Sequence, residues 1–271
     1  VFGYGLWVVQ LIAESLGKSG KGVIPIAGEP LMKPEHYGDD RFFVYLRLDT
    51  DDNNQTDKEI AEIRNNEHPV KTINMSDINS FGAEMFRWEI AISIAASILE
   101  VNPFNQPDVQ LSKTSTHKIL SNLSTSKLIA NIESDQISKL NSYLNSSQPN
   151  DYFGLLAYLP HNTSIDQALR SMREKVARKY KIATTLGHGP SYLHSTGQLH
   201  KGGPNSGVFL MLTAPHKDDI SIPTKSYTFG QVTDADAIGD LQTLKKLKRR
   251  VVHIKLANDS SAAISGLTEQ L

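Results

Sequence analysis

The sequence predicts an α/β fold in which layered parallel β-sheets are flanked by helices. β-rich runs and amphipathic helical patterns alternate along most of the chain, as is typical of parallel strands joined by crossover helices. A length of 271 residues, 39% of them apolar, is enough to bury one large core or two smaller ones. In such folds, we expect a functional site at the carboxyl ends of the strands.

Charge and composition exclude several classes of protein. The chain has 28 Lys+Arg against 29 Asp+Glu, which argues against a globally basic nucleic-acid-binding protein. The absence of cysteine excludes disulfides, zinc–thiolate sites, iron–sulfur clusters and a thiol nucleophile, and it favours a cytoplasmic location. No apolar run approaches the roughly 20 residues that cross a bilayer. We therefore expect neither a nucleic acid nor a membrane as a partner.

The first 120 residues are predicted to alternate between helices and strands. A helix is predicted over 6–16, because Trp7 and Leu11 recur at helical spacing and Gly17 ends the pattern. This pattern starts close to a first residue that is not Met, so we expect the chain to be part of a longer protein. Residues 81–100 are apolar on nearly every face, which predicts a helix buried on most sides. The other predicted elements are strands over 23–26, 42–48 and 70–74 and a polar helix over 57–65.

An Asn- and Ser-rich stretch over 121–150 is predicted to be a linker with one weak helix. It separates a first domain, 1–120, from a second α/β unit, 151–271. In the second unit the alternation resumes, with strands over 152–159, 182–186, 208–213 and 251–256 and with helices over 165–180, from 191 onward and over 235–247.

Glu14 is the first candidate catalytic residue. It lies seven residues after Trp7 and three after Leu11, on a helix face where the spacing favours an apolar residue. Burial of a carboxylate raises its pKa toward the range useful to a general base. The alternative, which spacing alone favours, is a partly exposed face on which Glu14 pairs with Lys18 or Lys21.

Residues 102–113 contain a Gln and a Lys seven residues apart. Pro107 suits the first position of a helix and Asp108 its first turn, so a helix is predicted to start here. Gln106 and Lys113 would then share one face and bind hydroxyl groups and negative charge. The alternative is a turn that carries two solvated side chains.

The segment 186–203 follows a predicted strand and contains five glycines and three histidines. Glycines let the backbone approach a ligand, and a helix starting near Ser191 offers free N–H groups to an anion. His188, His194 and His200 are six residues apart, a spacing that fits neither one helix face nor strand alternation. We therefore expect no metal site, and favour a single histidine acting in acid–base chemistry.

Three segments resemble those of phosphoglucose isomerases. Residues 14–18 (ESLGK), preceded by Gln10, are similar to the segment that carries the family's catalytic glutamate. Residues 102–113 resemble its C-terminal signature, in which a Gln and a Lys line the sugar-phosphate site. Residues 193–198 (LHSTGQ) are similar to its histidine segment. Together they look most like the isomerase portion of bifunctional transaldolase/phosphoglucose isomerase proteins.

The resemblance implies a sugar-isomerase (SIS-type) α/β fold that interconverts glucose 6-phosphate and fructose 6-phosphate through an enediolate, without a cofactor. Glu14 would move the proton between adjacent carbons. His194 would open the sugar ring with Lys113 beside it, and Lys113 would also stabilise the enediolate. Gln10 and Gln106 would hold the phosphate end of the substrate.

The chain departs from the family's pattern in two respects. The histidine segment follows the glutamate segment by about 180 residues, and no segment matches the family's phosphate-gripping loop and catalytic arginine, which belong to an upstream domain. We therefore expect a C-terminal part of a longer enzyme, with a phosphorylated hexose as substrate, upstream isomerase or transaldolase domains as partners and a homodimer as the assembly. The alternative is a non-catalytic sugar-phosphate-binding regulatory module, which would not need Glu14.

Overall fold

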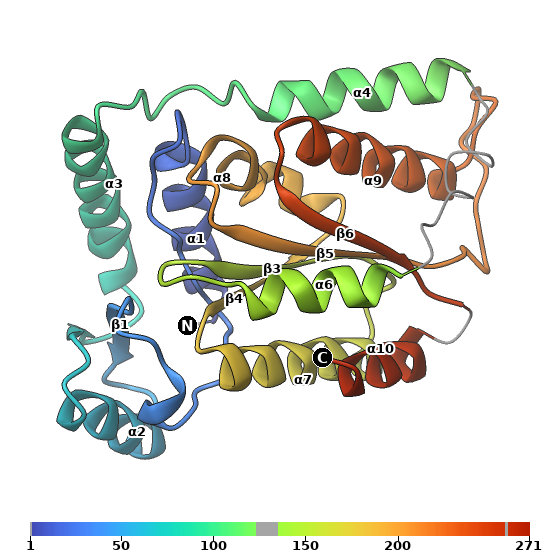
Figure 1. Cartoon of the computed structure of the whole chain (residues 1–271). Helices are drawn as coiled ribbons and strands as arrows, with labels where there is room; N and C mark the ends of the chain where they lie inside the picture. The colour runs from blue at the N-terminus through green and yellow to red at the C-terminus, as the bar shows by residue number, and fades with distance from the viewer. Residues whose placement is uncertain (1, 123–134, 258–259) are drawn as a thin grey trace.

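The computed structural model describes residues 2–122, 135–257 and 260–271. It has an α/β fold with parallel sheets flanked by helices, as predicted (Figure 1). One sheet consists of β1 (Phe43–Leu48) and β2 (Val70–Met75). The other has the order β4 (Ala183–His188), β3 (Tyr152–Tyr158), β5 (Gly207–Thr213) and β6 (Arg250–Lys255). Among the described residues, no helix is long and apolar enough to cross a membrane.

The chain changes direction across the larger sheet at β3. Helix α7 (Thr163–Tyr180) connects β3 to β4 on one side, and β5 then joins β3 on its other side. Helix α9 (Phe229–Lys246) connects β5 to β6 and packs on the opposite face from α7. The loops after β3 and β5 therefore diverge at a switch point, the position where doubly wound sheets bind ligands.

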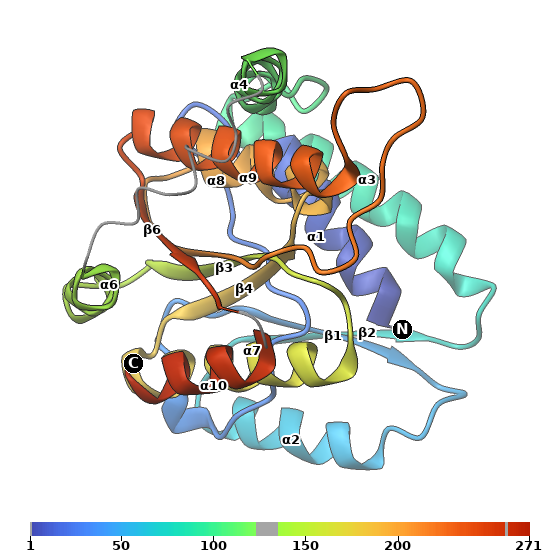
Figure 2. The same cartoon turned by 90° about the vertical axis from the view of Figure 1, so that its right-hand side faces the viewer.

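Both faces of the larger sheet are covered, and neither β3 nor β5 has an exposed residue. Such burial is expected of strands in a parallel sheet with helices on both faces. Phe153 and Leu155 face a core shared with α7, α6 (Gln136–Asn145) and α10 (Ser260–Glu269). Tyr152 and Leu156 face the other core, on the side of α9 (Figure 2).

Four further segments lie on the α9 side of the sheet. They are α1 (Phe2–Leu16), α4 (Val109–Asn122), the 3-10 turn η2 (Ser191–His194) and α8 (Gly197–Gly202). Helix α4 packs along α9, and α1 contacts α8, which directly follows η2. This arrangement brings the ends of α1 and α4 next to the segment that leads from β4 to β5 (Figure 1).

The smaller sheet forms a separate layer with helix α2 (Asn54–Asn65), which connects its two strands. Ile60 and Ile63 of α2 pack with Tyr37 in a small core that also includes Ala177 of α7. This contact attaches the smaller sheet to α7 near the C-terminal end of that helix (Figure 1).

Helix α3 (Ser80–Leu99) corrects one prediction, because it is not buried on most sides. It contacts α1 through Ile92 and Ala96, which are buried with Leu16. Its other faces carry large exposed side chains, including Phe86 at 64% and Ile98 at 76% exposure. The helix is apolar all round, but the described chain covers only one of its faces.

Two other predicted segments differ in detail. Residues 23–26 form no strand; Pro25 lacks the N–H that a strand would use, and Ile24 and Ile26 pack against the core on the α9 side. In the expected linker 121–150, Leu140 and Leu144 of α6 are fully buried against the larger sheet. Residues 123–134 of that linker lie outside the described residues.

Candidate active site

The side chain of Gln198, at the start of α8, joins the three segments that carry the candidate residues. Its amide nitrogen donates to the Gly17 carbonyl at 2.9 Å and to the Asp108 carboxylate at 2.6 Å. Its amide oxygen accepts from the Asp108 backbone N–H at 3.1 Å. Gln198 is fully buried, so these bonds hold the end of α1 and the start of α4 against its own segment.

Two glycines allow this close approach. A Cβ at Gly17 would lie 2.5 Å from Leu199 Cα, and a Cβ at Gly202 would lie 2.2 Å from the Asp108 carboxylate. The backbone N–H of Gly20 also donates to the Gly202 carbonyl at 2.8 Å. The end of α1 and the segment before α4 can therefore approach α8 this closely only because these positions lack a side chain.

Glu14 lies in the last turn of α1 and is half-buried. Partial burial raises the pKa of its carboxyl group above the ordinary value. The Gln10 amide, 3.4 Å from the carboxylate, and the charges of His194 and Lys18 act in the opposite direction. The direction of the net shift is the one expected for a general base that works near neutral pH.

Neither lysine of this segment forms a direct ion pair with Glu14. Lys18 is buried and donates to the Asn102 carbonyl at 2.5 Å, whereas Lys21 donates to the Leu99 carbonyl and pairs with Glu100 at 3.3 Å. Burial lowers the pKa of Lys18, and the charges of Glu14 and Asp108 oppose this shift. The spacing suggested that one of these lysines pairs with Glu14. In the structure both lysines instead bond to the end of α3 and to the loop after it.

His194 ends η2 and is exposed. Its charge acts on Glu14 of α1 and also on Asp236 of α9, so its ring lies within electrostatic reach of both carboxylates. Burial raises the pKa of Asp236, and a hydrogen bond from Thr116 of α4 opposes that shift. The structure thus brings together Glu14 and His194, which the sequence separates by about 180 residues.

The other candidate residues are less closely gathered. Gln10 is exposed on α1, one turn before Glu14. Gln106 is exposed in the turn before α4; because α4 begins at Val109, Gln106 and Lys113 do not share a helix face as expected. Lys113 belongs to α4, but its side chain lies outside the described residues.

A buried polar network next to this region was missed from the sequence. The Lys201 ammonium lies 2.6 Å from the Asp240 carboxylate, and both side chains are fully buried. The Tyr192 hydroxyl donates to Asp240 at 2.5 Å and accepts from the Tyr158 hydroxyl at 3.3 Å. Burial and Asp240 raise the pKa of Tyr192 well above its usual value.

The three histidines of the segment 186–203 separate in the fold. His200 is fully buried, and its Nδ1 lies 2.8 Å from the Tyr152 hydroxyl. Burial lowers its pKa to about 3, so His200 is a neutral core residue at pH 7. His188 ends β4, whereas His194 is exposed at the end of η2.

A cavity of about 590 Å³ opens at the carboxyl ends of β3 and β5, at the switch point of the sheet. Gln10, Glu14, Gln106 and His194 do not line it, and the side chain of Lys113 lies outside the described residues. The lining residues come from the loops after β3, β4 and β5 and from α7, α9 and α10: Tyr158, Leu159, Pro160, Asn162, Ser164, Ile165, Gly189, Ala214, Pro215, His216, Lys217, Asp218, Thr233 and Ser261.

Comparisons with known proteins assign no family. No family model and no curated protein matches the chain. Among solved structures, the chain is similar to the crystal structure of hypothetical protein TT0462 from Thermus thermophilus, with a TM-score of 0.41 and 12% identity. This similarity covers 98% of the present chain and 74% of that one, and it carries no functional inference.

Proposed function

We propose that this chain supplies the proton-transferring part of a sugar-phosphate isomerase of the phosphoglucose isomerase type, with an SIS-type fold. The observation that carries the proposal is the half-buried carboxylate of Glu14 within electrostatic reach of His194. The hydrogen bonds of Gln198 support it further, because they join the same three segments on which the resemblance rests.

The proposed reaction interconverts glucose 6-phosphate and fructose 6-phosphate. After ring opening, one proton moves between adjacent carbons through an enediolate, and a single carboxylate can take it from one carbon and return it to the other. Burial favours this role for Glu14, because a raised pKa makes the carboxylate a stronger base. No cofactor is needed for this step.

The remaining candidate residues take roles around the proton transfer. The exposed ring of His194 is accessible to a substrate and would pass protons at the ring oxygen, with Lys113 beside it to stabilise the enediolate. The exposed amides of Gln10 and Gln106 would bind the phosphate end. We further propose that upstream isomerase or transaldolase domains complete the site and that the enzyme acts in the cytoplasm.

One observation favours the alternative, a regulatory module that binds a sugar phosphate without turnover. The described cavity lies at the switch point of the sheet, and Gln10, Glu14, Gln106 and His194 do not line it. A regulatory module of this kind would use that cavity and would not depend on Glu14.

Glu14→Gln in the full-length gene product distinguishes the two functions. In D2O, an isomerase incorporates deuterium next to the carbonyl carbon, because the enediolate stage exchanges its proton with solvent. We expect Glu14→Gln to lower interconversion and deuterium incorporation by about 10² to 10⁴-fold while binding of the sugar phosphate persists. Nuclear magnetic resonance follows both quantities in one sample.

Glu100→Gln is the matched control, because Glu100 is an exposed carboxylate at the end of α3. We expect it to keep full activity. Sugar-phosphate binding without turnover by the unmodified protein would favour the regulatory module, and unchanged turnover in Glu14→Gln would exclude Glu14 as the proton shuttle.

His194→Ala tests the ring-opening step separately. If His194 transfers protons at the ring oxygen, its loss slows the reaction of the cyclic sugar more than that of an open-chain substrate. Equal slowing of both substrates, accompanied by a lower thermal midpoint, would assign His194 a structural role instead.

A further inference from the structure

Three side chains with metal-binding atoms meet at the carboxyl edge of the larger sheet. His161 lies in the loop after β3, Asp166 in the first turn of α7, and His188 at the end of β4. One ligand atom from each lies within 4.8 Å of those of the other two. The group is separate from Glu14 and His194, and the proposed isomerase reaction does not use it.

The distances within this group are close to those of a metal site. Asp166 Oδ1 lies 3.9 Å from His161 Nδ1 and 3.9 Å from His188 Nε2. In a tetrahedral zinc site with bonds near 2.1 Å, neighbouring ligand atoms are about 3.4 Å apart. The nitrogen atoms of His161 and His188 lie within 4.8 Å of each other, so shifts of about 0.5 to 1.5 Å would bring the three atoms into coordination distance of one ion.

The backbone that carries these ligands is well anchored. The Asn162 side chain caps α7 by accepting from the Ile165 N–H at 2.9 Å, which fixes the turn that holds Asp166. His188 pairs with Ala157 of β3, and the next N–H, from Gly189, donates to the Ala157 carbonyl at 2.8 Å. Ligands on a capped helix and a strand end keep their relative positions better than ligands on a free loop.

The surroundings of the three side chains leave room for a positive charge. The rings of His161 and His188 are 3.8 Å apart between their centroids, so both imidazoles face the same small space. In the described parts of the chain, no lysine or arginine forms an ion pair with Asp166, so its carboxylate is available to a cation.

We propose that His161, Asp166 and His188 bind one divalent transition-metal ion of the Zn²⁺ and Co²⁺ class. Two imidazoles and one carboxylate are a donor set suited to these ions, whereas Mg²⁺ and Ca²⁺ prefer oxygen ligands alone. Three protein ligands leave a coordination position for water or a bound molecule. The chain neighbours of the ligands, Pro160, Asn162, Ile165 and Gly189 among them, line the 590 Å³ cavity, which places the site at its rim.

The test uses the full chain without a histidine tag, after removal of metal with a chelator. Zn²⁺ and Co²⁺ are titrated by calorimetry, and Co²⁺ is also followed by its visible absorption, which reports the coordination geometry. We expect one ion per chain, and no saturable binding of Mg²⁺ under the same conditions. His161→Gln, Asp166→Asn and His188→Gln should each weaken Zn²⁺ binding at least about tenfold.

His117→Gln is the matched control, because His117 is an exposed histidine on α4 that does not line the cavity. It should keep the full affinity. Zn²⁺ should also raise the thermal midpoint of the unmodified chain and of His117→Gln but not of the three ligand variants, which separates lost binding from misfolding. Absence of 1:1 binding, or unchanged affinity in the three ligand variants, would overturn the proposal.

Discussion

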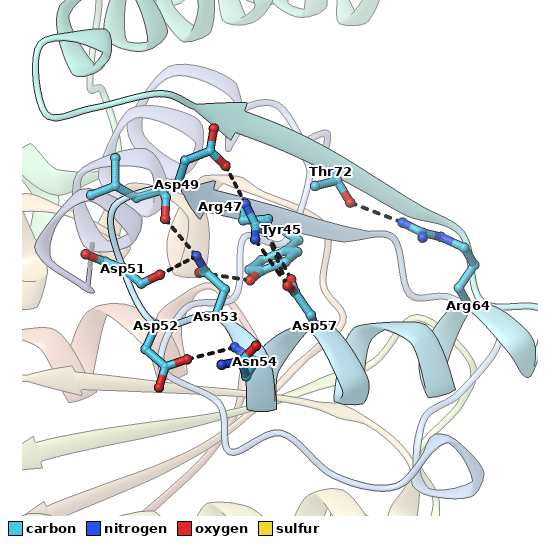
Figure 3. A network of polar contacts seen from close by, with 11 residues as sticks. Tyr45, Arg47, Asp49, Asp51, Asp52, Asn53, Asn54, Asp57, Arg64 and Thr72 are labelled. Atoms are coloured by element: carbon cyan, nitrogen blue, oxygen red, sulfur yellow. Dashed lines mark hydrogen bonds and ion pairs between the residues drawn. The ribbon is translucent and has the colours of Figure 1, made fainter.

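Two networks of charged side chains in this protein use the same chemistry in opposite surroundings. One is the buried network of Lys201, Asp240 and Tyr192 beneath α9. The other lies around Arg47 at the end of the smaller sheet, where the Arg47 guanidinium bonds Asp57 at 3.1 Å and also contacts Asp49 (Figure 3). Solvent reaches the Arg47 network, whereas both ionic side chains of the buried network are completely enclosed.

This difference in burial predicts a difference in energetic consequence. Water and salt screen an exposed pair, and its long side chains lose conformational freedom when they pair. A fully buried charge has no water to replace a lost partner, so removal of one partner is strongly unfavourable. Side chains of the same type are therefore expected to tolerate substitution in one network and not in the other.

The largest effect is expected for Asp240→Leu, which leaves the Lys201 ammonium buried without its carboxylate. We expect the free energy of unfolding to fall by about 3 to 5 kcal/mol. Urea denaturation followed by circular dichroism measures this change. A fall below about 1 kcal/mol would mean that solvent enters the site and that the two networks do not differ as proposed.

Combining Lys201→Met with Asp240→Leu should recover most of that loss. An apolar pair of similar size can replace a buried ion pair at little cost, because neither charge then has to be desolvated. The measurement is the same urea titration of the double variant beside each single variant. If the double variant loses as much stability as the sum of the single variants, the network stabilises the fold through its full set of hydrogen bonds.

The pH dependence of stability extends the comparison to single groups. Burial lowers the pKa of His200 to about 3 and that of His253 to about 4, whereas an unfolded chain binds these protons near pH 6.5. As pH falls below 6.5, the unfolded state gains protons that the folded state does not, so stability decreases. We expect a loss of about 2 kcal/mol per histidine between pH 7 and pH 5.

Asp57 titrates in a different pH range. The Arg47 hydrogen bond lowers the pKa of Asp57, so its contribution is present above about pH 4 and is lost only as pH falls further. Urea midpoints at pH 7, 5 and 3 separate the two ranges. His253→Gln should flatten the decline between pH 7 and pH 5, and an unchanged slope would contradict the assignment to His253.

The smallest effect is expected for Arg47→Gln in the exposed network. Its ionic contacts are solvent-accessible and screened, so we expect only a small decrease in the urea midpoint at physiological salt. The same titration at low ionic strength gives the upper limit of the effect. A midpoint shift as large as that of Asp240→Leu would remove the contrast between the networks.

Much of the larger sheet could be predicted because its strands are continuous apolar runs and its helices are amphipathic. The predicted strand over 208–213 and helix over 165–180 match β5 and α7 within two residues. The burial of α3 could not be predicted, because a helix that is apolar all round does not reveal which faces the fold covers. The short run 23–26 resembles a strand in sequence but forms none, because Pro25 lacks the N–H that a strand would use.

The sequence suggests candidate residues within one segment more readily than it shows which segments lie near one another. Glu14 became a candidate from its place on an apolar helix face, whereas its position within electrostatic reach of His194 depends on how α1 and η2 pack. The group of His161, Asp166 and His188 was missed because the spacing test compared His188 with the histidines that follow it. The other two side chains of the group precede it, in a loop and a helix turn that only the β3–β4 pairing brings close.

The hydrogen bonds of Gln198 also bear on the order in which the chain folds. They join Gln198 to residues 90 and 181 positions away along the sequence. Contacts between such distant segments require large loops to close, whereas helices and neighbouring strands form from nearer residues. We therefore expect the region around Glu14 to become ordered after the β3–β5 core during folding and to lose its protection from hydrogen exchange before that core in mild denaturant.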